Sequence, residues 1–220
     1  ASLARVHGLM AQGEAYCHPA LLRKPERERI MHFSEPAHFI LTHRIMIRAD
    51  RLALFEPFRM PDGSIDAQRL VKNPALVTAM SEKRAYSPSI SAALAELDDD
   101  RHILRAGVEF KSPFHQLMEG WIDYLFAYPV EYGWYQHQGQ GLPEQALLAL
   151  RIHGDPELII GYVTCTRSEW GATIIREVNA AMHRVRGIPP WIERAIQYTA
   201  PSELEAYLRA LERESPYRTP

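Results

Sequence analysis

Apolar residues with helical spacing predict helices near both ends of the chain. Leu3, Val6 and Met10 form one stripe along residues 2–13, which is typical of an amphipathic helix. Three more helices are expected near the C-terminus, over residues 168–187, 190–197 and 201–212. Ser168 stands where its hydroxyl can cap the first of these three helices.

Between these helical regions, short apolar runs alternate with helical patterns. Residues 39–48 carry β-branched side chains in partial alternation and predict one long strand. Further strands are expected over residues 76–80, 102–106, 122–127, 147–152 and 158–165, and helices over residues 88–97, 113–119 and 129–136. This alternation predicts an α/β protein in which helices wrap a small parallel sheet.

Composition limits the function classes. With 220 residues, of which 46% are hydrophobic, the chain can bury one large core or form two small lobes. The net charge of −2 gives no basic field for nucleic acid, so no nucleic-acid partner is expected. No run approaches the roughly 20 apolar residues of a membrane span. The opening residues lack the apolar core of a signal peptide, so any export signal is expected to lie outside this sequence.

Residue types that bind metals or perform catalysis show no recognisable pattern. Two cysteines are too few for a cysteine-based zinc site but leave one disulfide possible. The ten histidines contain no His-x-x-x-His pair, and His32, His38 and His43 are expected at the surface or in hydrogen bonds. No nucleophile elbow, phosphate loop or nucleotide fingerprint is present. We therefore expect no metal, no cofactor and no catalytic residue.

The first candidate site is the charged turn that precedes Phe33 and Ser34. Arg27 or Arg29 can hold a carboxylate or phosphate through two parallel hydrogen bonds. The alternative is a solvated turn in which neighbouring glutamates neutralise both arginines.

Two further candidates follow predicted strands. Arg84, Tyr86 and Ser87 precede Pro88, where the free N–H groups of a helix start can hold an anion. The alternative there is a plain capped helix, with Ser87 as the cap. Tyr128 ends an apolar run and offers an aromatic wall to a small ligand, although a core strand would look the same. Asp123, in that run, is interpreted as a structural residue.

Three blocks occur in an order that resembles the type II periplasmic binding proteins, near the family 3 solute-binding proteins of amino-acid ABC transport. The blocks are Phe-Ser-Glu-Pro at 33–36, Arg-Ala-Tyr-Ser at 84–87, and Gly-Trp-Ile-Asp at 120–123 followed by Tyr128. The resemblance implies an α/β fold of two hinge-linked lobes that close on a solute.

The same resemblance implies a division of the chain. Residues 1–40 would form the first part of lobe 1, 41–157 lobe 2, and 158–220 the return to lobe 1 with the C-terminal helices. The family normally places about two strands and a helix before this starting point. The N-terminal part of lobe 1 is therefore expected to be missing from this sequence, and the alternative is a lobe 1 that is built differently. Cys17 and Cys165 would lie on neighbouring strands of lobe 1, where an oxidising periplasm permits a disulfide.

By position, Arg27 matches the family arginine that binds a ligand carboxylate, and Tyr86 and Ser87 match lobe 2 residues that meet the same group. Arg84 flanks them. Tyr128 replaces the acidic residue that usually binds an α-ammonium, which implies a solute without that amine or one bound through Glu131.

The function that this resemblance implies is periplasmic binding of a small, carboxylate-bearing solute between two closing lobes, for ABC transport. The protein is expected to be a monomer that binds a membrane permease. One alternative is a ligand-sensing module of a signalling system. Another is an enzyme on the same fold, of the dehydratase kind, with Glu131 or Asp123 as acid or base.

Overall fold

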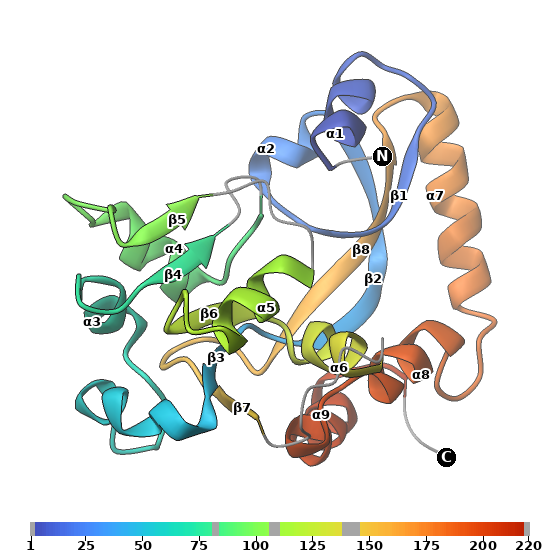
Figure 1. Cartoon of the computed structure of the whole chain (residues 1–220). Helices are drawn as coiled ribbons and strands as arrows, with labels where there is room; N and C mark the ends of the chain where they lie inside the picture. Colours follow the sequence, from blue (N-terminus) through green and yellow to red (C-terminus); the bar gives the residue numbers. More distant parts are fainter. Residues whose placement is uncertain (1–2, 81–83, 106–110, 138–145, 218–220) are drawn as a thin grey trace. The chain divides into compact units, whose positions relative to one another are not determined.

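The computed structural model describes residues 3–80, 84–105, 111–137 and 146–217. The chain divides into two compact units. The first unit comprises Ala1–Ile40, Leu158–Ala195 and Leu208–Pro220, and the second unit comprises Leu41–Glu157 and Ile196–Tyr207. Each unit contains its own β-sheet with helices packed against it (Figure 1).

The sheet of the first unit has the strand order β1-β8-β2. These strands are β1 (Cys17–Leu22), β2 (Met31–Leu41) and β8 (Leu158–Thr166), with β1 antiparallel to β8. The helices of this unit are α1 (Leu3–Ala11), α2 (Pro25–Glu28), α7 (Glu169–Met182), α8 (Pro190–Gln197) and the second half of α9 (Pro201–Glu214). Helix α7, orange in Figure 1, packs along β8. Ser168 caps α7 as predicted, because its Oγ accepts a hydrogen bond from Gly171 N at 3.1 Å.

The disulfide that the family resemblance implied, between Cys17 and Cys165, is present in the first unit. Cys17 pairs with Cys165 in the β1–β8 register, and the two side chains form a disulfide with an S–S distance of 2.00 Å. Val6 and Met10 of α1 pack with Leu21 in a small apolar core, so the predicted helical stripe is confirmed.

The sheet of the second unit has the strand order β5-β4-β6-β3-β7. Its strands are β3 (Arg44–Arg48), β4 (Thr78–Met80), β5 (Ile103–Arg105), β6 (Tyr124–Ala127) and β7 (Leu147–Leu150). Strand β4 is parallel to β5 and β6, whereas β3 is antiparallel to β6 and β7. The prediction of a parallel sheet is therefore correct for only part of a mixed sheet.

Helices cover both faces of this sheet. They are α3 (Ala67–Val71), α4 (Pro88–Ala95), α5 (Lys111–Met118) and α6 (Pro129–His137), with two 3-10 helices at Ala49–Leu54 and Glu56–Phe58. Alternate residues of a strand point to opposite faces. Tyr124 and Phe126 accordingly join one apolar cluster with α4, while Leu125 and Ala127 join another with α5 and α6. This explains why β6 is apolar at every position.

The long strand expected over residues 39–48 is wrong, because β2 ends at Leu41 and β3 begins at Arg44 in a different sheet. Tertiary contacts impose this break. Thr42 N donates to Glu157 O at 2.9 Å, and the buried Arg44 side chain forms ion pairs with Glu157 and Glu203.

The structure also differs from the expected lobe division at residues 196–207, which belong to the second unit. Glu203 Oε2 lies 2.8 Å from Arg44 Nε, and Ala200 is buried in the apolar core with α5 and α6. A Cβ on Gly133 would lie 1.8 Å from the Tyr198 carbonyl oxygen, so the segment packs directly on the α6 backbone. These contacts tie the segment to the second unit.

Candidate functional site

Five of the six predicted ligand-binding residues lie at one edge of the second unit's sheet. Strands β4 and β6 are parallel neighbours, so their carboxyl ends meet at the same edge. Arg84, Tyr86 and Ser87 follow β4, and Tyr128 and Glu131 follow β6. In open α/β sheets, this edge is where ligands characteristically bind. We call these five residues, together with His43, the strand-end cluster.

The central contact of the strand-end cluster is an ion pair. Arg84 Nη2 donates to Glu131 Oε2 at 2.7 Å, and the same oxygen accepts from Tyr128 N at 2.9 Å. Glu131 is the third residue of α6, and from there its carboxylate reaches back to the residue that precedes the helix, as in one half of a capping box. The positive end of the α6 dipole also favours this carboxylate.

Aromatic rings surround the guanidinium. Arg84 Cζ lies 4.8 Å from the centre of the Tyr128 ring and 5.9 Å from that of Tyr86, both within the range of cation–π attraction. The His43 ring centre is 4.0 Å from that of Tyr128 and 5.5 Å from that of Tyr86. One arginine and three rings therefore form a contiguous stack.

His43 is the member of the strand-end cluster that the sequence did not reveal. It is fully buried, and neither ring nitrogen has a hydrogen-bond partner among the described residues, so the expectation of a surface or hydrogen-bonded histidine is wrong. Burial, and secondly the charge of Arg84, lower the pKa of His43 to about 2. The ring is therefore neutral at physiological pH. It stands in the break between two strands, and no local pattern marks it.

Ser87 is the second unsatisfied polar group. It precedes α4 as expected, yet its side chain makes no capping hydrogen bond. Its Oγ and the Arg84 Nε are buried and have no partner within the described part of the chain. The prediction of Ser87 as a side-chain cap is wrong. Each unsatisfied buried polar group lowers the stability of the folded state by about 1–3 kcal/mol. Several such groups in one place therefore call for an explanation.

Arg27, the sixth predicted residue, lies in α2 of the first unit. It is only 6% exposed, and its Nη1 donates to Leu22 O at 2.7 Å. The alternative of a solvated arginine is therefore wrong. Glu28, which was expected to neutralise it, instead lies 2.5 Å from Arg23 Nε.

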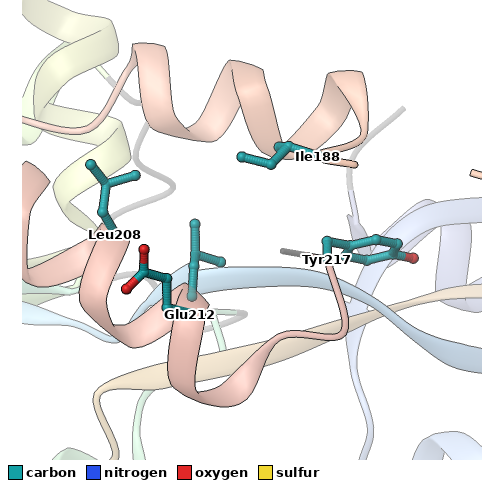
Figure 2. Close-up of a pocket in the computed structure, with 5 residues that line it drawn as sticks. Ile188, Leu208, Glu212 and Tyr217 are labelled. Carbon is teal, nitrogen blue, oxygen red and sulfur yellow. The ribbon is translucent and has the colours of Figure 1, made fainter. Parts of the chain in front are cut away.

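A small pocket of about 70 Å³ occurs in the first unit (Figure 2). Its lining is mostly apolar, with one carboxylate, and consists of Ile188, Leu208, Leu211, Glu212 and Tyr217. Sites for solutes of drug size enclose about 300–1,000 Å³. This pocket holds little more than one side chain and contains none of the predicted ligand-binding residues.

The described residues contain no group of three or more histidine, cysteine, aspartate or glutamate side chains placed to hold a metal ion. Within the same residues, the helices are all too short or too polar to cross a lipid bilayer.

No protein-family model matches the chain, and no curated protein sequence is significantly similar to it. Solved structures do match. Holo ArgBP from T. maritima has a TM-score of 0.54 at 15% identity, with 83% of this chain and 69% of that chain covered.

Two more structures cover 97% of this chain. One is ytmK from Bacillus subtilis, described as a probable amino-acid ABC transporter extracellular-binding protein, with a TM-score of 0.56, 11% identity and 76% of its length covered. The other is the B. pertussis BvgS periplasmic domain, with a TM-score of 0.57, 16% identity and 37% of its length covered. This chain has the fold of the type II periplasmic binding proteins, an α/β architecture of two lobes, which confirms the expected fold class.

Proposed function

We propose that this protein binds a small solute at the strand-end cluster of the second unit and that the two lobes of its fold close on that solute. The observation that supports this most strongly is the gathering of unsatisfied polar groups beside the half-buried rings of Tyr86 and Tyr128. Ser87 Oγ, Arg84 Nε and the His43 ring nitrogens have no partner among the described residues. A bound solute would supply partners for groups that are otherwise costly to bury.

The proposed solute carries a carboxylate, and we assign that group to Arg27. A planar guanidinium can bind a carboxylate through two parallel hydrogen bonds. The burial of Arg27 supports this assignment, because charge-assisted hydrogen bonds are stronger where water is excluded.

Binding rather than catalysis is favoured by the way in which the two candidate acids are held. Asp123 Oδ2 accepts from Val77 N at 2.8 Å, a structural contact between the segments that lead into β6 and β4. Glu131 is tied to Arg84 and to Tyr128 N. The ArgBP and ytmK structures are likewise binding proteins by description.

For the cellular role, we propose a periplasmic component of ABC transport that delivers solute to a membrane permease. The likeness to ytmK supports this role. A ligand-sensing module is the second candidate. It is favoured by the match to the BvgS periplasmic domain, which covers 37% of that longer chain. A transmembrane or kinase segment in the full gene would identify the sensing role.

Solute binding is tested by thermal shift against amino acids, dicarboxylates, aromatic acids and short peptides, with the methyl ester of each hit as a control for the carboxylate. A solute at 100 times its dissociation constant adds about 2.7 kcal/mol of stability. Silence across the panel contradicts the proposal, and a hit whose ester binds equally well contradicts the carboxylate assignment.

Ser87→Ala separates binding from folding. Because the hydroxyl has no partner within the described residues, its removal should leave the free energy of unfolding unchanged or slightly raised. The affinity for a panel hit should fall about tenfold, as expected for one lost hydrogen bond. Ser202→Ala, at an exposed position of α9 in the same unit, is the control and should change neither quantity. Unchanged affinity in Ser87→Ala excludes this serine from the site.

A further inference from the structure

The strand-end cluster balances its own charge. Arg84 and Glu131 pair at 2.7 Å, and the side chains are 24% and 9% exposed, so solvent screens the pair only in part. The Glu131 carboxylate is held in place by a second hydrogen bond, from Tyr128 N. The His43 ring contacts Tyr86 and Tyr128, the aromatic neighbours of Arg84. This ring is neutral because burial, and secondly the charge of Arg84, lower its pKa. One positive and one negative charge therefore leave the cluster with no net charge.

A charged solute group would meet an opposing charge in this arrangement. An ammonium group placed against Tyr128 would lie near the Arg84 guanidinium, which is already 4.8 Å from that ring. A carboxylate group would compete with Glu131 for the same guanidinium. Either ion would gain one attraction and one repulsion of similar size while losing its hydration.

The cluster can satisfy an uncharged polar group. Arg84 Nε–H is a donor, Ser87 Oγ donates and accepts, and a neutral imidazole has one nitrogen of each kind. The rings of Tyr86 and Tyr128 lie beside these groups, and both contact the His43 ring.

We infer that the strand-end cluster selects an uncharged group that both donates and accepts hydrogen bonds, of the carboxamide class, and discriminates against ammonium and carboxylate groups. The inference rests on the proposed function, since it names the part of the solute that this cluster binds. The part of the solute that this cluster binds is then a neutral amide or a similar polar group.

The test uses three probes of one shape and three charges: acetamide, acetate and acetamidinium. Each is titrated at up to tens of millimolar into ¹⁵N-labelled protein, and the signals of Arg84 Nε–H and of the His43 ring nitrogens are followed. Acetamide should give saturable shifts at concentrations at least tenfold below those of the two ions. Equal or stronger responses to either ion, or no saturable response to any probe, overturn the inference.

Variants that change the charge of the cluster test the same inference with the same three probes. Glu131→Gln leaves Arg84 without its carboxylate and should move the preference at least tenfold toward acetate. Arg84→Gln should move it toward acetamidinium, with the His43 ring as reporter, and the double variant should return to acetamide. Glu96→Gln removes an exposed ion pair with Lys72 in the same unit and should keep the wild-type order. An unchanged order in both single variants overturns the inference, and if neither folds, the wild-type titration decides.

Failure here is distinguishable from failure of the proposed function. If a solute in the thermal-shift panel binds but the cluster prefers acetate or acetamidinium, the proposal of solute binding stands and only the inferred carboxamide class is rejected. Silence in the panel combined with saturable binding of acetamide contradicts the proposed function but retains the inferred class of group that the cluster binds.

Discussion

The buried His43 ring makes the stability of the protein depend on pH in a defined direction. Its pKa is about 2 in the folded protein and about 6.5 in an unfolded chain. Below pH 6.5 the unfolded chain therefore binds a proton that the folded protein excludes, and the folded state loses stability as the pH falls toward 2. Above pH 6.5 both states are neutral at this residue, and it contributes no pH dependence.

The size of the effect follows from the same two values. Each pH unit below 6.5 costs about 1.4 kcal/mol, so lowering the pH from 7.5 to 5.0 should remove about 2 kcal/mol through His43 alone. Replacement by phenylalanine keeps a planar ring between Tyr86 and Tyr128 but removes the titrating group. The His43→Phe variant should therefore lose about 2 kcal/mol less than the wild type over this range.

The assay is urea unfolding at pH 7.5 and 5.0, followed by both fluorescence and circular dichroism to establish whether one transition or two occurs. Only the difference in pH dependence between the two proteins is used, because other histidines contribute equally to both. Parallel pH profiles for wild type and His43→Phe would refute the reasoning. A His43 ring signal that titrates near pH 6 in NMR would refute it independently.

Two further predictions concern the first unit. Replacing Cys17 and Cys165 by serine opens a cross-link between residues 148 positions apart and should lower the free energy of unfolding by about 3–5 kcal/mol; equal stability of the oxidised and reduced wild type would contradict this. Gly171→Ala places a Cβ 1.9 Å from the Thr166 carbonyl oxygen and should lower the free energy of unfolding by about 3 kcal/mol or more. Gly8→Ala, with nothing within 4 Å of the added Cβ, should raise it by about 0.5–1 kcal/mol. Similar effects of the two alanines in urea unfolding would show that the close approach at Gly171 is not rigid.

Most helices and strands were predictable because their signals are local. The helix expected over residues 129–136 is α6 (Pro129–His137), and the strand expected over 158–165 is β8 (Leu158–Thr166). A proline at the first helical position and a largely apolar run identify such elements without tertiary information. The break at residues 42–43 was not predictable, because apolar periodicity does not reveal that one run crosses from one sheet to another.

Five of the six members of the strand-end cluster were candidates from the sequence, whereas His43 and the contacts among the six were not. The sequence blocks indicated Arg84, Tyr86, Ser87 and Tyr128, and the replacement of the family's acidic residue by Tyr128 suggested Glu131. The parallel pairing of β4 with β6 brings these residues to one edge. The ion pair between Arg84 and Glu131 joins residues 47 positions apart, so it depends on the fold and not on local spacing. The burial of His43 has the same origin.

The central claim is that a solute binds at the strand-end cluster, and the most direct measurement is an experimental structure of the protein with the strongest solute from the panel. The account predicts that the solute contacts Tyr86, Ser87 and Tyr128 and supplies hydrogen-bond partners to groups that lack them in the described residues. A solute bound elsewhere, with Ser87 Oγ and the His43 ring still unpartnered, would contradict it.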